Sequence, residues 1–113
     1  LEPQVWFDVC ALDAVWPGTG RAALVRGRQI AVVRMPDGST VYAIDHFDPW
    51  SRAHVLGRGI VGDRGGVPKI TSPVYKQSFD LRTGECLDDP AVKVPVYPVR
   101  VRAGRIEVAW RVR

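Results

Sequence analysis

Residues 70–85 read I-T-S-P-V-Y-K-Q-S-F-D-L-R-T-G-E and combine three local structural signals. Ser72-Pro73 is a turn dipeptide, because proline restricts both its own φ and the conformation of the residue before it. The run Val74–Leu81 has the aromatic and β-branched content of a strand. Arg82–Glu85 then contains a Thr-Gly pair, which is typical of a chain reversal. The stretch therefore predicts a β-type unit made of a turn, a strand and a second turn.

The rest of the chain repeats this pattern of short β-type runs between turn residues. Further strands are predicted at Gln4–Val9, Arg21–Val25, Gln29–Met35, Thr40–Ile44, Val67–Ile70, Val96–Arg102 and Arg105–Val112, with one helical turn at Ala11–Val15 and tight turns at 26–28, 36–39 and 103–104. No segment has a helical period over a useful length. The predicted fold is therefore an all-β, antiparallel β-sandwich or barrel. Pro95 and Pro98 indicate an edge strand or a bulge at 96–102, because proline cannot donate to a β-ladder.

A segment of different character, Asp45–Gly66, interrupts these strands. It is polar and rich in glycine, and we predict a long Gly-rich loop insertion, a feature that is often functional. The run G-R-G-I-V-G-D-R-G-G at its end lacks the G-K-S/T ending of a phosphate-binding loop. Asp88-Asp89-Pro90 is predicted to be a turn or a helix cap. With 113 residues and no repeat or linker, residues 1–113 are expected to form one domain.

The formal net charge is +4. Much of the excess lies near the C-terminus, at Arg100, Arg102, Arg105, Arg111 and Arg113. Arginine alternating with valine in V-R-V-R and W-R-V-R is typical of the solvent face of a half-buried strand. We favour this interpretation over a nucleic-acid surface. An acidic protein partner is a further alternative.

The two cysteines, Cys10 and Cys86, are interpreted as free thiols in a reducing cytosol. A disulfide between them stays open, because the sequence does not give the distance that separates them. Neither has a second ligand at the spacing of a cysteine metal site. No apolar run approaches the roughly 18 residues of a membrane span, and the start of the chain lacks the pattern of a signal peptide.

His46 and His54 are the residues that first suggest a metal or catalytic site. Asp45, Asp48 and Asp63 lie near them in the sequence and would be candidate zinc ligands. The spacing matches neither H-x-H nor H-E-x-x-H, so we interpret both as loop histidines that are hydrogen-bonded locally or to solvent. A catalytic serine at Ser51 or Ser72 is disfavoured, because no G-x-S-x-G motif surrounds either residue.

Trp50 is an unusual aromatic residue because it follows Pro49 in a loop. A large aromatic side chain there is either packed under the loop or exposed to a partner. Aromatic and arginine residues are favoured at protein interfaces. The candidate partner interface therefore comprises Trp50, Arg52, Arg58, Tyr75 and Lys76, with packing as the alternative.

Taken together, the two loop segments resemble a Rieske-type iron–sulfur domain. That family holds a [2Fe–2S] cluster with C-P-H in one loop and with C-P-x-H in a second, which continues into an F-D-L-x-T-G-E type of strand. Here D-H-F-D-P-W and S-P-V-Y-K-Q-S-F-D-L-R-T-G-E match those loops. The resemblance puts Asp48 and Ser72 at the cysteine positions, and Trp50 and Tyr75 at the histidine positions.

A Rieske cluster requires two thiolates and two imidazoles, and none of these four residues supplies either. We therefore expect a Rieske-like fold with its cluster ligands replaced, no metal site and no cofactor in this chain. We also expect Trp50 and Tyr75 to fill the vacated space with apolar area. The first alternative is a Rieske-type electron carrier with an atypical metal site. Others are the ferredoxin of a ring-hydroxylating dioxygenase and a nucleic-acid-binding β-domain.

A narrower resemblance is to the small subunits of assimilatory NAD(P)H-dependent nitrite reductases. It extends over about Val5–Val108 and is carried by R-G-I-V-G-D-R-G-G and C-L-D-D-P-x-V-x-V-P-V-Y-P. The resemblance implies a cytoplasmic subunit without a catalytic centre. It would dock on a large subunit that carries FAD, a [4Fe–4S] cluster and sirohaem and that reduces nitrite to ammonium in nitrate assimilation. The basic C-terminal hairpin and the loop tips at Trp50 and Tyr75 are the candidate docking surfaces.

Overall fold

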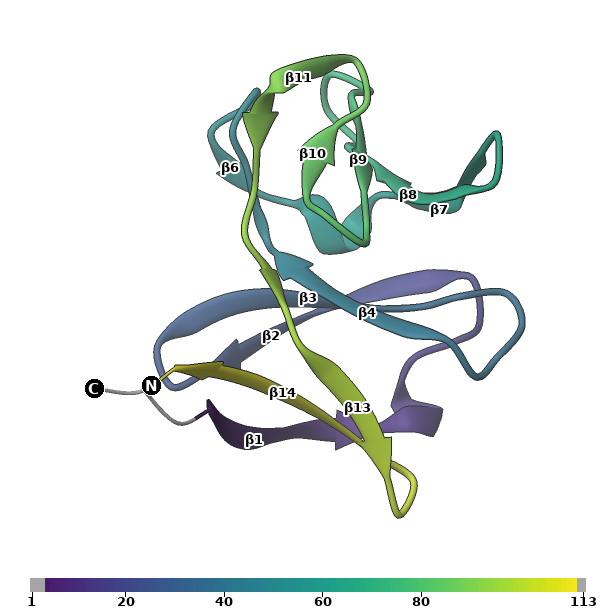
Figure 1. Ribbon diagram of the computed structural model, residues 1–113, viewed down its shortest axis with the longest axis vertical. Coiled ribbons are helices and arrows are strands. Elements are labelled where there is room, and N and C mark those ends of the chain that lie inside the picture. Colours follow the sequence, from purple (N-terminus) through teal and green to yellow (C-terminus); the bar gives the residue numbers. More distant parts are fainter. Residues whose placement is uncertain (1–3, 112–113) are drawn as a thin grey trace.

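The computed structural model describes residues 4–111 and shows an all-β fold of antiparallel sheets, as predicted (Figure 1). Within these residues the strands are β1 (Gln4–Ala11), β2 (Thr19–Val25), β3 (Arg28–Arg34), β4 (Val41–Asp45), β5 (Phe47–Asp48), β6 (Ala53–His54), β7 (Ile60–Arg64), β8 (Val67–Thr71), β9 (Ser78–Asp80), β10 (Glu85–Cys86), β11 (Asp89–Lys93), β12 (Val96–Tyr97), β13 (Val99–Arg102) and β14 (Arg105–Arg111). Two 3₁₀ turns, η1 (Leu12–Ala14) and η2 (Leu56–Arg58), complete the secondary structure. No helix in this part of the chain is long and apolar enough to cross a membrane.

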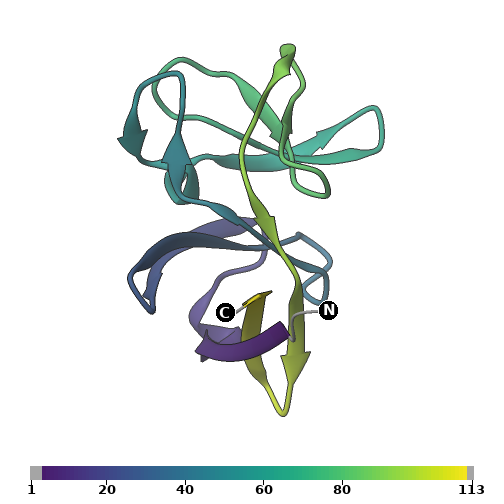
Figure 2. The same cartoon turned by 60° about the vertical axis from the view of Figure 1, so that its left-hand side comes forward.

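The lower part of the molecule in Figure 1 consists of two sheets, in the strand orders β12-β4-β3-β2 and β1-β14-β13. The upper part holds the sheet β11-β10-β9-β8-β7 and the small hairpin β5-β6, and both views place these strands on one side of β3 and β4 (Figure 2). The sheet that contains β3 and β4 therefore lies between the other elements and has a core on each face.

Strand β3 shows how the sequence produces this arrangement. Side chains alternate along a strand, so neighbouring residues face opposite sides of the sheet. Ile30 and Val32 pack in the lower core with Ile106 and Val108, whereas Ala31 and Val33 pack in the upper core with Phe79, among others. Double burial explains why β3 has the continuous apolar run I-A-V-V instead of alternating apolar and polar residues.

Several predicted turns and edges are confirmed. Arg26 and Gly27 join β2 to β3 with φ angles of 50° and 83°, the signature of the two-residue turn that suits a hairpin. The helical turn after β1 is the short η1. Pro98 separates β12 from β13, and both of these strands lie at the edge of their sheets. Proline is tolerated there because an edge strand needs fewer backbone donors.

The prediction of a long, weakly structured Gly-rich loop at Asp45–Gly66 is wrong about the secondary structure of this segment. That segment contains β5, β6, η2 and the whole of β7, which pairs with β8 from Ile60↔Thr71 to Arg64↔Val67. Gly65 and Gly66 form the connecting turn, both with positive φ. The glycines at the end of the run therefore make a hairpin turn between two paired strands.

Two other boundaries differ from the predictions. The strand expected at Val74–Leu81 is only Ser78–Asp80, because residues 73–77 form a loop. Asp88-Asp89-Pro90 was expected to be a turn or a cap, but Asp89 and Pro90 begin strand β11. Strand β11 lies at the edge of its sheet, and its pairing with β10, at Glu85↔Lys93 and Cys86↔Asp89, holds the chain extended there.

Candidate functional site

Two loops define the candidate site, and each is anchored on a pair of strands. The first loop, residues 48–53, joins β5 to β6 and is closed by the Arg52 backbone N–H, which donates to the Asp48 carbonyl oxygen at 2.7 Å. The second loop, residues 72–77, joins β8 to β9. It is closed by the Ser72 backbone N–H, which donates to the Gln77 carbonyl oxygen at 2.8 Å. Both loops therefore project from paired strands.

A buried hydrogen bond connects the two loops. The Ser72 hydroxyl donates to Oδ2 of Asp48 at 2.5 Å across 24 residues of sequence. The same oxygen accepts a hydrogen bond from the Ser51 hydroxyl at 2.9 Å, and Oδ1 accepts one from the Trp50 backbone N–H at 2.9 Å. Asp48 and Ser72 are both 0% exposed. Burying a carboxylate is costly unless its oxygens are satisfied, and these three donors satisfy both oxygens of Asp48.

The side chains at the tips of the two loops face outward. Trp50 is 36% exposed, Val74 46% and Tyr75 61%. The expectation that Trp50 and Tyr75 fill an interior space is therefore wrong. The buried contact between the loops is polar and is made by Asp48 and Ser72, while the aromatic residues lie at the surface.

Four of the five predicted interface residues lie on these two loops: Trp50, Arg52, Tyr75 and Lys76. Arg58 belongs to a different element, the 3₁₀ turn η2. That turn sits directly against β2, since a Cβ atom added at Gly20 would lie 2.7 Å from the carbonyl oxygen of Gly57. The structure thus brings together the loop members of the predicted set and assigns Arg58 to a different element.

The two histidines occupy different environments. His46 is only 4% exposed, and its Nδ1 accepts a hydrogen bond from the Gly57 backbone N–H at 3.0 Å. Local hydrogen bonding is thus confirmed for His46, but it is a buried residue. His54 is exposed, and its ring contacts Phe47 edge-on at a centroid distance of 5.2 Å. Burial, together with the positive charges of His54 and Arg58, lowers the pKa of His46.

The other candidate ligands do not assemble around these histidines. Asp63 lies on β7, where its Oδ2 accepts a hydrogen bond from the Gly66 backbone N–H at 3.2 Å. Cys10 and Cys86 are both free thiols, and they belong to different core clusters. Over residues 4–111, no three His, Cys, Asp or Glu side chains are grouped closely enough to hold a metal ion.

The basic C-terminal hairpin uses its arginines largely within the domain. Arg100 forms an ion pair with Glu107 at 2.6 Å, and its guanidinium lies 4.1 Å from the centre of the Trp6 ring. Arg105 donates two hydrogen bonds to the Asp8 carboxylate, at 2.6 and 2.9 Å, and lowers the pKa of that carboxyl. These pairs agree with the interpretation of a solvent-facing strand surface. The side chain of Arg111, and Arg113 altogether, fall outside the described structure.

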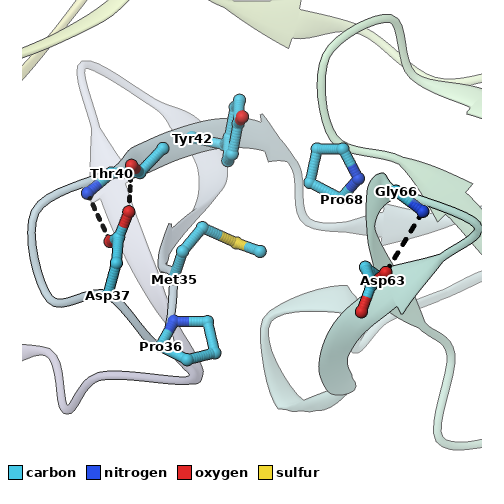
Figure 3. Close-up of a pocket in the computed structure, with 8 residues that line it drawn as sticks. All are labelled: Met35, Pro36, Asp37, Thr40, Tyr42, Asp63, Gly66 and Pro68. Carbon is cyan, nitrogen blue, oxygen red and sulfur yellow. Dashed lines mark hydrogen bonds between the residues drawn. The ribbon is translucent and has the colours of Figure 1, made fainter.

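A shallow cleft of about 360 Å³, which the sequence did not predict, lies between the β3–β4 and β7–β8 connections (Figure 3). Its lining residues are Met35, Pro36, Asp37, Thr40, Tyr42, Asp63, Gly66 and Pro68. Figure 3 shows both carboxylates engaged within their own turns, Asp37 with Thr40 and Asp63 with Gly66. Hydrogen bonds from Thr40 and Ser39 lower the pKa of Asp37. The carboxylates of this cleft therefore stabilise two turns.

The antiparallel sheets and the paired loops define a Rieske-like domain, and the Rieske-like [2Fe–2S] domain family matches residues 5–109. The nitrite reductase (NADH) small subunit of Salmonella typhimurium is 37% identical over 103 residues, which cover 91% of this chain and 95% of that protein. A crystal structure from Mycobacterium tuberculosis, assigned as an NADH-dependent nitrite reductase small subunit, superposes with a TM-score of 0.93. The two sequences are 50% identical, and the superposition covers 99% of this chain and 100% of that chain. The chain belongs to the small-subunit family of NAD(P)H nitrite reductases.

A third relative differs in size. The nitrite reductase [NAD(P)H] large subunit of Klebsiella oxytoca is 42% identical over 108 residues, which cover 96% of this chain. This chain spans only 11% of the length of that large subunit. A domain similar to this one is therefore part of a much longer chain in that protein.

Proposed function

We propose that this chain is the non-catalytic small subunit of a cytoplasmic NAD(P)H nitrite reductase and that it docks on the large subunit. In this proposal the large subunit carries FAD, a [4Fe–4S] cluster and sirohaem, and reduces nitrite to ammonium for nitrate assimilation. The small subunit supports the large subunit or controls access to its cofactors.

The observation that carries this proposal is the contact between Asp48 and Ser72. A Rieske centre binds one iron through two cysteines and the other through two histidines, so the two cysteine positions must lie side by side. The 2.5 Å contact between the two side chains satisfies that requirement of position. It also supports the alignment of these residues with the cysteine ligands of the family.

The residues present do not fit a [2Fe–2S] cluster. The side chains of Asp48 and Ser72 are hydrogen-bonded to each other and fully buried. Both carboxylate oxygens of Asp48 accept hydrogen bonds. Trp50 and Tyr75 provide neither a thiolate nor an imidazole. We therefore assign no electron-transfer step to this chain.

A role in docking is supported by two separate observations. Trp50, Val74 and Tyr75 are large apolar side chains exposed on adjacent loops, and exposed apolar patches often mark interaction sites. In addition, a large-subunit chain from Klebsiella oxytoca includes a domain that is 42% identical to this one. In that protein the similar domain and the large subunit are parts of one chain. Where the domain is a separate chain, we expect it to bind the large subunit.

Co-purification of the two chains tests the proposal. Both subunits from the same organism are expressed together and purified through a tag on the small chain, and iron and acid-labile sulfide are measured on each chain after separation. We expect a stable complex in which iron and sulfide are found only with the large subunit. Stoichiometric iron and sulfide on the small chain would overturn the absence of a cluster and favour an electron carrier. A large subunit that is equally stable and active alone would overturn the supporting role.

A further inference from the structure

We infer that the tips of the two loops form a single docking surface for an apolar face of the large subunit bordered by carboxylates, and that the buried Asp48–Ser72 hydrogen bond holds the two tips as one surface. This inference rests on the proposed function and deepens it, because it selects one of the two candidate docking surfaces. It also gives the residues at the former ligand positions a role.

The centre of the surface is apolar. Trp50 lies on the first loop, and Val74 and Tyr75 lie on the second. Tryptophan and tyrosine are the residues that most often dominate binding energy at protein interfaces, because they bury a large area with few rotatable bonds. The two tips together therefore provide two aromatic anchors, and Val74 adds an aliphatic side chain next to Tyr75 on the second loop.

The border of the surface is basic, and the Lys76 ammonium donates a hydrogen bond to the Pro73 carbonyl oxygen at 3.3 Å. Arg52 and Lys76 are exposed, and neither forms an ion pair with a carboxylate of residues 4–111. Arg100 and Arg105 of the C-terminal hairpin, by contrast, are already paired with Glu107 and Asp8. On the hairpin, a partner's carboxylates would have to displace the pairs of Arg100 and Arg105, and Arg102 is the one arginine with a described side chain there that forms no ion pair. Charge complementarity therefore favours the loop surface and a partner with an acidic border.

The backbone of the loops is held in a defined shape. Arg52 and Lys76 have φ angles of 58° and 67°, a region that residues other than glycine rarely adopt. Such a conformation costs free energy and persists only where surrounding contacts impose it. Arg52 lies two positions after Trp50, and Lys76 directly follows Tyr75. The constrained part of each loop is therefore the turn that presents the aromatic side chain.

Asp48 is the group that connects the tips. Its carboxylate accepts from the Trp50 backbone N–H and, across the gap between the loops, from the Ser72 hydroxyl. Ser72 in turn accepts a hydrogen bond from the Val74 backbone N–H at 3.3 Å. The chain of bonds thus runs from one tip to the other. Holding both loops before binding removes part of the entropy that association would otherwise cost.

The apolar centre is tested first, by binding of the complete small subunit to the cognate large subunit in a calorimetric or surface-based titration. We expect W50A and Y75A each to weaken binding at least about tenfold. W16A is the matched control, because Trp16 is 77% exposed but lies on the β1–β2 connection. If wild type binds and W50A and Y75A bind as tightly as W16A, the docking surface is elsewhere. If wild type does not bind, the proposed function itself fails.

The connecting bond is tested with a pair of serine variants. S72A removes the hydroxyl that joins the loops, whereas S51A removes a hydroxyl that bonds the same Asp48 oxygen from within the first loop. We expect S72A to weaken binding by about three- to tenfold and S51A to have a clearly smaller effect. In a W50A/Y75A background, S72A should have little further effect, because the bond acts through the tips. Equal effects of S72A and S51A, or full additivity with the tip variants, would overturn the positioning role.

Discussion

The Gly57 backbone N–H donates a hydrogen bond of 3.0 Å to Nδ1 of His46, so the neutral form of this buried imidazole holds the η2 turn in place. The His46 backbone extends the connection, since its carbonyl oxygen accepts from the Leu56 N–H at 3.0 Å. A protonated imidazole has no acceptor, because both ring nitrogens then carry hydrogen. The bond to Gly57 therefore depends on the protonation state of His46.

This relationship predicts a pH dependence of stability. Burial, followed by the charges of His54 and Arg58, lowers the pKa of His46 below its usual value of 6.5. Between the two pKa values the unfolded chain binds more protons than the folded chain, so the free energy of unfolding falls as the pH drops below about 6.5. Urea midpoints measured between pH 7.5 and 5.5 should decrease for wild type. H46Q should lose this slope, and H54Q should keep most of it. An unchanged slope in H46Q would contradict the assignment.

A second prediction concerns Gly84, whose φ angle is 83°. A Cβ atom there would overlap the carbonyl oxygen of Val94, and the Val94 N–H donates to the Gly84 carbonyl oxygen at 2.9 Å. G84A should therefore destabilise the fold by about 3 kcal/mol or more, through conformational strain and a steric clash. G65A is the control: its φ is also positive, at 58°, but no atom lies within 4 Å of the added Cβ. It should cost only about 1 kcal/mol in urea unfolding. Equal losses of unfolding free energy in G84A and G65A would show that the backbone moves to relieve the clash with Val94.

Trp110 on β14 is predicted to be the main aromatic contributor to the lower core. Its ring stacks on Phe7 at a centroid distance of 4.3 Å and lies 4.8 Å from the Arg28 guanidinium carbon. W110A should lower the free energy of unfolding by about 2 kcal/mol or more. W16A removes an exposed ring and should change it by less than about 0.5 kcal/mol. Thermal or urea unfolding of both variants provides the comparison, and a similar small loss in W110A would count against this packing.

Introducing Rieske-type ligands tests the positions of the two loops. The variant D48C/W50H/S72C/Y75H carries two thiols and two imidazoles at the positions that the resemblance aligns with Rieske ligands. After anaerobic reconstitution with iron and sulfide, we expect about two irons per chain and visible absorption, and neither in wild type treated identically. D48C/S72C alone should retain less metal. A folded quadruple variant that binds no iron would show that the loops do not bring these four positions together.

Much of the framework is predictable from local patterns, because turns and alternating strands depend on nearby residues. The β2–β3–β4 meander and the C-terminal hairpin were predicted in this way. Strand β7 was missed because its glycines resemble a loop until the pairing with β8 is known. The burial of His46 was missed for a similar reason, since its hydrogen-bond partners come from β3 and η2, which are distant in the sequence: Gln29, Leu56 and Gly57.

The sequence by itself determined which chemical groups occupy the four positions that the resemblance aligns with Rieske ligands: a carboxylate, an indole, a hydroxyl and a phenol. The tertiary structure alone decided that Asp48 and Ser72 meet in a buried hydrogen bond, 24 residues apart in the chain. It also decided that Trp50 and Tyr75 face outward, although apolar area alone would have favoured burial. The physical reason is that a fully buried carboxylate must be satisfied by donors, and only the folding of β5–β6 against β8–β9 brings the Ser72 hydroxyl to it.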